Sequence, residues 1–139
     1  MGLRPFLLVP AVLAASACSA EMEREPIARA PGIEALGEPV NCLPLNRIRD
    51  TTVHDDFTID FETVDGQTYR NTLPRQCYSL GFERRFGYAT SINRLCSTDI
   101  VNVLYSDGRR GPGCGLGEFL PVRVIRQEPG AEPVVRPAS

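Results

Sequence analysis

Cysteine is the residue type in this chain whose chemistry is most informative, because thiols pair, bind metal or carry lipid. The five cysteines are Cys18, Cys42, Cys77, Cys96 and Cys114. In an oxidising compartment four of them can form two disulfide bonds, and the fifth then needs a separate use. Zinc is disfavoured because no two cysteines have the C-x-x-C spacing and His54 is the single histidine. The sequence therefore predicts no metal site and no cofactor.

Cys18 is the cysteine that the first residues of the chain set apart. After Arg4, residues 5–17 form an uncharged run of the length found in signal peptides, too short to span a bilayer. The run ends in Ala15-Ser16-Ala17-Cys18, which resembles the bacterial lipobox, where a cysteine is acylated and becomes the first mature residue. The alternative is simple cleavage after Ala17, which would leave a soluble periplasmic protein with a bare thiol.

Lipidation of Cys18 is the interpretation we favour, because it leaves an even number of cysteines for disulfides. Ser19 follows Cys18 in place of the aspartate that often marks retention in the inner membrane. We therefore predict a signal peptide over residues 1–17 and an exported outer-membrane lipoprotein that faces the periplasm. The lipid at Cys18 would be its contact with the membrane.

Arginine accounts for all fifteen basic residues, and five of them could form an anion-binding patch. These five are Arg75, Arg84, Arg85, Arg109 and Arg110. Guanidinium groups form paired hydrogen bonds, so the patch would suit a carboxylate, a phosphate or a lipopolysaccharide headgroup. Three aromatic residues near Arg84 could add stacking, namely Phe82, Phe86 and Tyr88. The formal net charge of -2 and the exported location argue against nucleic acid as a partner.

A histidine and four carboxylates close together in the sequence are the other candidates for chemistry. They are His54, Asp55, Asp56, Asp60 and Glu62. Two carboxylates could carry out acid–base catalysis or bind calcium, and the histidine could act as a general base. We expect instead that Asp55 and Asp56 form a turn and that the other three side chains lie in solvent. The sequence therefore does not predict an enzyme.

Six short runs predict the strands that would carry these side chains, mostly from a period of two. Residues 47–54 are rich in β-branched residues, and residues 99–105 are a nearly continuous apolar run suited to a strand buried on both sides. They cover residues 47–54, 57–62, 67–73, 85–91, 99–105 and 118–126. In the second run Phe57, Ile59 and Phe61 alternate with polar residues, as expected for a strand with one buried face. Six short strands with little helix indicate a mainly β fold, a small six-stranded antiparallel barrel or curled sheet with two disulfides.

The connections between these runs have their own signatures. Asp65-Gly66 is the two-residue signature of a type I′ hairpin turn. Residues 75–81 suggest an irregular crossing or a single helical turn. The glycine-rich residues 108–117 lack the Lys-Ser/Thr ending of a phosphate-binding loop, so we expect a flexible connection held at Cys114.

The composition divides the chain into four parts. After the signal peptide, residues 18–41 hold the lipidated cysteine and a flexible acidic tether with five glutamates and three prolines, with at most a short helical turn at residues 33–36. As a coil, this tether would place the domain roughly 25–30 Å from the bilayer. Residues 42–126 form the disulfide-stapled β domain, and residues 127–139 read as a disordered tail.

The pairing of the four domain cysteines cannot be derived from the sequence, because four cysteines allow three connectivities. We expect Cys42 to pair with Cys114 and Cys77 with Cys96, which would close the ends of the domain and staple its middle. Each bond would stabilise so small a domain by about 2–4 kcal/mol.

The motifs resemble a known group of proteins over residues 41–122. The run NCLPLNRIRDTTVHDDFTIDFE, followed by YRNTLPRQCYSLGFERRFGY, RLCSTDIVNVL and CGLGEFLPV, is similar to an uncharacterised family of small proteobacterial secreted proteins and lipoproteins. The resemblance implies a four-cysteine domain of unknown function, with Asp99 after the third domain cysteine. It supports the domain limits and implies no activity.

Two classes of function are therefore expected. The first is a membrane-tethered, non-enzymatic binding or accessory module that recognises an envelope protein or glycan. The alternative is a small periplasmic hydrolase, or an inhibitor of one, with an atypical site; it requires at least two titratable groups with strongly shifted pKa values in one pocket.

Overall fold

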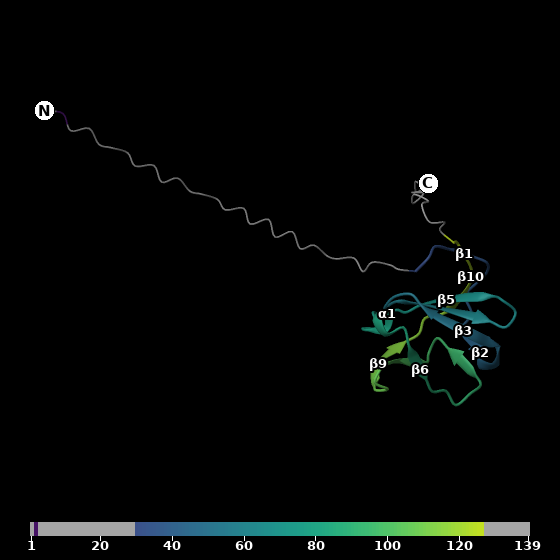
Figure 1. Ribbon diagram of the computed structural model, residues 1–139. Coiled ribbons are helices and arrows are strands. Elements are labelled where there is room, and N and C mark those ends of the chain that lie inside the picture. Colours follow the sequence, from purple (N-terminus) through teal and green to yellow (C-terminus); the bar gives the residue numbers. More distant parts are fainter. Residues whose placement is uncertain (1, 3–29, 127–139) are drawn as a thin grey trace.

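The computed structural model describes Gly2 and residues 30–126, and residues 30–126 form one β-rich body (Figure 1). Apart from Gly2, the predicted signal peptide lies outside the described residues, as do Cys18, residues 19–29 of the predicted tether and the predicted tail. Among the described residues no helix is long and apolar enough to cross a membrane.

Ten strands, one α-helix and one 3-10 helix make up the described chain. In order they are β1 (Ile33–Ala35), β2 (Cys42–Pro44), the 3-10 helix η1 (Leu45–Arg47), β3 (Ile48–Val53), β4 (Thr58–Thr63), β5 (Thr68–Thr72), α1 (Leu80–Glu83), β6 (Phe86–Tyr88), β7 (Arg94–Cys96), β8 (Ile100–Leu104), β9 (Arg110–Gly115) and β10 (Phe119–Val124). Each of the six predicted runs overlaps one of these strands, and five of the six contain theirs in full.

The strands form three antiparallel sheets, so the prediction of a mainly β fold is confirmed and that of a barrel or curled sheet is wrong. The sheets have the orders β1-β10-β5-β4-β3, β6-β8-β9 and β2-β7. The hydrophobic pattern did not show four of the strands, β1, β2, β7 and β9. The six predicted strands divide between the five-stranded and the three-stranded sheet and do not close on one another.

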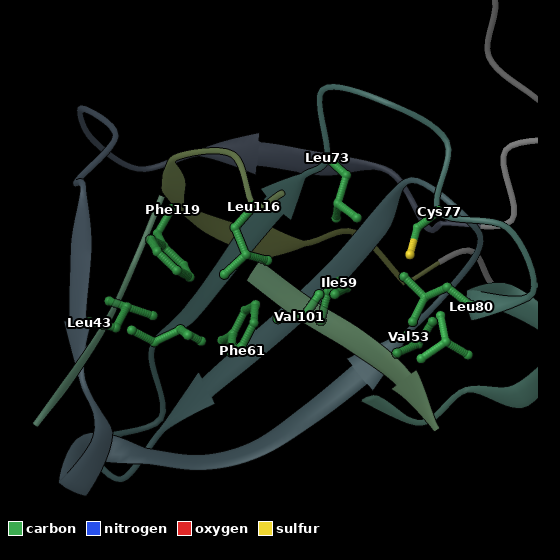
Figure 2. Packing of buried hydrophobic residues seen from close by; sticks show 12 residues of the cluster. Leu43, Val53, Ile59, Phe61, Leu73, Cys77, Leu80, Val101, Leu116 and Phe119 are labelled. Atoms are coloured by element: carbon green, nitrogen blue, oxygen red, sulfur yellow. The ribbon is translucent and has the colours of Figure 1, made fainter. Parts of the chain in front are cut away.

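The core lies between the five-stranded and three-stranded sheets (Figure 2). Ile59 and Phe61 of β4 face Val101 and Val103 of β8, and all four side chains are buried. Leu43 and Leu95 from the β2-β7 pair join the same cluster. The alternation predicted for residues 57–62 therefore does place Ile59 and Phe61 in the core.

The β4-β5 hairpin differs from its predicted turn by one residue. Thr63 pairs with Gln67 through a backbone N–H to O distance of 2.9 Å, so the loop has three residues, Val64, Asp65 and Gly66. A type I′ turn needs positive φ at both central residues, whereas only Gly66 has it, at 84°. A glycine closes the loop between β8 and β9 in the same way, at Gly108 with φ 86°.

The two disulfides are Cys42–Cys96 and Cys77–Cys114, so four paired cysteines are confirmed and the predicted pairing is wrong. The strands decide the partners. Cys42 of β2 lies directly opposite Cys96 of β7. Cys114 lies on β9, and its disulfide ties that strand to the segment that leads into α1. The two bonds indicate an oxidising compartment outside the cytoplasm.

Strand β1 lies within the residues assigned above to the tether. Ile33, Glu34 and Ala35 pair with β10, so a strand occupies the place where a helical turn was considered. Val40 also forms a β-bridge with Phe119. The described body therefore includes residues 30–41 as well as the predicted domain.

Candidate functional site

A buried ion pair crosses the outer face of the five-stranded sheet. Asp60 of β4 and Arg70 of β5 are cross-strand partners, and both are 7% exposed. Two hydrogen bonds join them, from Arg70 Nε to Asp60 Oδ1 at 2.7 Å and from Arg70 Nη2 to Asp60 Oδ2 at 2.8 Å. This fork geometry is the strongest that a guanidinium and a carboxylate can form.

His54 and the first described residues complete this cluster. His54 Nε2 lies 2.7 Å from Asp60 Oδ2, and the His54 side chain is 16% exposed. Arg70 Nη1 donates to the backbone carbonyl of Pro31 at 2.6 Å. The cluster therefore links the residue after β3 and the middle of β4 and β5 to the segment before β1.

The Asp60 carboxyl is held in its charged form. Burial raises its pKa, but the hydrogen bonds and charges of Arg70 and His54 outweigh burial and lower the pKa below its ordinary value. A carboxylate of low pKa with both oxygens bonded to a guanidinium is a poor proton acceptor at neutral pH. The expectation that Asp60 and His54 lie in solvent is wrong. Their contacts link neighbouring strands, which is a structural role.

Asp55 and Asp56 form the turn that was expected of them. The Asp55 carboxylate accepts the backbone N–H of Phe57 at 2.8 Å. Asp56 binds the segment before and within α1: its Oδ1 accepts the N–H of Gly81 at 2.8 Å and its Oδ2 accepts Gln76 Nε2 at 3.0 Å. Asp56 is therefore a positioning residue for α1.

Residues 75–85, which we call the α1 knob, surround the single turn of α-helix. Its base is fixed by the Cys77–Cys114 disulfide and by the hydrogen bond from Cys77 N–H to the Asp56 carbonyl at 2.8 Å. Gly81 lies so close to the backbone of Asp55 that a Cβ there would come within 2.9 Å of the Asp55 Cα. Figure 1 shows α1 at one edge of the body, with β2 at the other.

The α1 knob exposes two aromatic rings. Phe82 is 86% exposed and Tyr78 is 68% exposed. Between them Leu80 is fully buried in the core cluster and anchors the turn. Because Leu80 faces the core, the turn presents the phenyl ring of Phe82 to water.

Strand register brings two of the predicted arginines to either side of Leu104. Leu104 of β8 is the partner of Arg110 on β9, and its N–H donates to the carbonyl of Arg85 at 3.0 Å. Val103 faces the core, so its neighbour Leu104 points to the opposite face, and cross-strand neighbours share that face. We call Arg84, Arg85, Leu104 and Arg110 the arginine surface.

The five predicted arginines differ in their pairing. Arg109 Nε lies 2.6 Å from Asp107 Oδ2, and its guanidinium lies 5.5 Å from the centroid of the Tyr105 ring. Within residues 30–126, no carboxylate lies within ion-pair distance of Arg75, Arg84, Arg85 or Arg110. Arg75 is exposed at the start of the α1 knob. Four cationic side chains are therefore free to bind an anion.

The aromatic residues predicted to lie near these arginines separate into two groups. Phe86 packs edge-on against Phe61, at 6.1 Å between ring centroids, and so belongs to the core. Tyr88 is exposed and lies 6.4 Å from Phe86. Phe82 and Phe86 are each two positions from Arg84 in the sequence, and of these two rings Phe82 is the exposed one.

The predicted glycine loop is largely strand β9. Its glycines leave room for the side chains of the neighbouring strand β8, since a Cβ at Gly113 would come within 3.1 Å of Ile100 Cγ2. A Cβ at Gly111 would come within 2.9 Å of the Tyr105 ring. The described part of the chain contains no group of three or more His, Cys, Asp or Glu that could hold a metal ion.

Comparisons with known proteins identify no relative. No protein-family model, no curated protein and no solved structure matches this chain. The structure shows four cysteines paired in a small β domain, which is the coarse part of the resemblance described above. The identity of the family itself stays a prediction.

Proposed function

We propose that this protein is a membrane-tethered envelope lipoprotein whose β domain binds an anionic partner without catalysing a reaction. The arginine surface and the adjoining α1 knob are the binding site. The observation that carries the proposal is the position of Arg85 and Arg110 on either side of Leu104, beside a helical turn that exposes Phe82. An envelope protein or an acidic glycan would supply the matching carboxylates or phosphates.

The chemistry of the site supports binding. Arginine and aromatic residues dominate the energetics of protein interfaces, because both combine large apolar area with directional polar groups. The α1 knob has three arginines and one glutamate, a net charge of +2. A side chain without an internal carboxylate partner loses no ion pair when it binds an external anion.

The hydrolase alternative is less well supported by the arrangement of its candidate groups. His54 and Asp60 do lie together, but both oxygens of Asp60 are bonded to Arg70. Among the described buried groups Asp60 has the one shifted pKa, whereas the alternative requires at least two in one pocket.

The test is capture of partners from intact envelopes by chemical crosslinking and co-purification. The double variant Arg84→Ala with Arg85→Ala should reduce capture at least about tenfold, because truncating an interface arginine costs more than about 1 kcal/mol. Its melting temperature should stay that of the wild type, since neither side chain has a partner within the described structure. The matched control is Arg94→Ala with Arg126→Ala, which removes the same charge elsewhere. Equal capture by the two double variants would refute the proposal.

A further inference from the structure

The aromatic rings of the α1 knob form a projection, not a pocket. Phe82 is 86% exposed and Tyr78 is 68% exposed. This exposure is unfavourable, because an apolar ring has a lower free energy when it is removed from water. Tyrosine has an apolar ring with a polar hydroxyl and suits a boundary between water and an apolar phase. A projection of this kind has to enter its partner.

The charge around these rings selects the kind of partner. Arg75, Arg84 and Arg85 flank the rings in sequence and have no carboxylate within ion-pair distance in residues 30–126. Arg110 extends the positive charge across Leu104. Anionic lipid headgroups attract such clusters, and each arginine near the surface strengthens binding about fivefold.

The α1 knob is ordered before it binds anything. Three contacts hold the turn in place. They are the Cys77–Cys114 disulfide, the two hydrogen bonds of the Asp56 carboxylate and the burial of Leu80. A rigid turn loses little conformational entropy when Phe82 becomes immobilised.

The position of the predicted lipid favours a bilayer over a protein cavity. From Cys18 to Ala30, the first residue of the described body, the chain advances 12 positions and can span at most about 40 Å. A lipid at Cys18 would therefore keep the α1 knob within reach of the membrane surface, where its effective concentration is high. A bilayer also accepts a convex group without a matching hollow.

We propose that the α1 knob docks on the anionic surface of a phospholipid bilayer, with Phe82 entering the headgroup region and Arg84 and Arg85 binding lipid phosphates. This inference rests on the proposed function, since it keeps the same anion-binding site and names an anionic lipid surface, in place of an envelope protein or glycan, as the partner. The lipid at Cys18 and the α1 knob would then hold the domain at two points and fix its orientation on the membrane.

The test measures binding of the mature chain, residues 18–139, carrying Cys18→Ser, which removes both the apolar signal segment and the thiol that would be acylated. Co-sedimentation is compared for vesicles of phosphatidylcholine with phosphatidylglycerol and vesicles of phosphatidylcholine alone. Binding should require phosphatidylglycerol and should weaken as salt is raised. Phe82→Ala should reduce binding about tenfold. Arg84→Ala with Arg85→Ala should reduce it about 25-fold.

Matched controls keep the result specific to the α1 knob. Ile92→Ala removes another exposed apolar side chain, and Arg94→Ala with Arg126→Ala removes two charges elsewhere. These variants should stay within about threefold of the unsubstituted protein, because attraction to the surface falls off within a Debye length. A melting curve for each variant confirms that it is folded.

The outcomes separate this inference from the proposed function. Absence of binding to anionic vesicles, or equal loss in the test and control variants, would overturn the inference. A second outcome is that the protein fails to bind vesicles while the Arg84→Ala, Arg85→Ala variant still captures less of an envelope protein or glycan in the crosslinking assay. In that case the partner is not lipid and the proposed function stands. If neither assay responds to that variant, both proposals are wrong.

Discussion

At the scale of single residues, Asp60 shows how a charged group can be kept inside this small domain. Removal of a carboxylate from water is costly, and two hydrogen bonds from Arg70 with a third contact from His54 compensate for that cost. Arg70 in turn binds the carbonyl of Pro31. The alternation in β4 could not reveal this burial, because it separates the two faces of a strand and does not say which faces are covered.

Replacement of Asp60 should show this dependence directly. Asp60→Asn leaves the Arg70 guanidinium buried without its counter-charge, so the free energy of unfolding at neutral pH should fall by about 3–5 kcal/mol. Urea unfolding measures the change. Glu118→Gln is the control, since Glu118 is exposed and its substitution should change stability by less than about 0.5 kcal/mol.

The pH dependence of that difference follows from the lowered pKa of Asp60. A carboxyl group whose pKa is lower in the folded state stabilises the fold fully above its unfolded pKa, about 3.9, and loses this contribution as pH falls through the folded value. The gap between wild type and Asp60→Asn should therefore shrink below about pH 4. A gap that stays constant down to about pH 2 would contradict the assigned role of Asp60.

At the scale of elements, the strands with a clear apolar pattern were predictable and four others were not. Residues 57–62 overlap β4, where apolar side chains repeat every second position, and residues 99–105 contain β8, where the apolar run is nearly continuous. β1 and β9 escaped notice because one has three residues among prolines and glycines and the other contains three glycines and a proline in six positions. Backbone pairing with a longer neighbour, and not side-chain pattern, makes them strands.

The register of the β4-β5 hairpin was present in the sequence although the predicted turn missed it. Phe61 can lie opposite Tyr69 only if the loop between the strands has an odd number of residues. A two-residue turn would place Phe61 opposite Arg70 and force a charge towards the core. Consistent faces therefore required the observed three-residue loop, and with it Asp60 opposite Arg70.

The arginine surface was less accessible to prediction. Arg84-Arg85 and Arg109-Arg110 stood out as pairs, but their meeting at Leu104 depends on an irregularity in the β8-β9 pairing between Asn102 and Leu104. No local signal in the sequence indicates that shift. The cysteine pairing was hidden for a similar reason, because it depends on which strands are neighbours.

The Cys77–Cys114 disulfide gives a prediction at this scale. Cys77→Ser with Cys114→Ser should lower the free energy of unfolding by about 2–4 kcal/mol and loosen the α1 knob, so capture of the partner should weaken as well. Thermal unfolding and the crosslinking assay measure the two effects. Non-reducing peptide mapping of the wild type should recover Cys77 linked to Cys114 and Cys42 linked to Cys96. A Cys77–Cys96 peptide would contradict the structure.

At the scale of the whole molecule, the predicted lipid at Cys18 would anchor a domain whose two disulfides indicate an oxidising compartment. If Cys18 carries the lipid, Cys18→Ser should abolish acyl labelling and release the protein into the soluble periplasmic fraction. Labelling with a fatty-acid probe, followed by fractionation, measures both. The control is Ser19→Ala, which leaves the thiol in place. An unlabelled wild type would contradict the anchor and leave simple cleavage after Ala17.

If the α1 knob is the part of this domain that touches a partner, a crosslinker at position 82 should capture that partner. The most direct measurement places a photo-crosslinking amino acid at position 82 in the full chain and irradiates intact envelopes. We expect a discrete adduct that disappears when Arg84→Ala and Arg85→Ala are added, and no such adduct from the same probe at position 92. Absence of an adduct at position 82, or equal crosslinking at both positions, would contradict it.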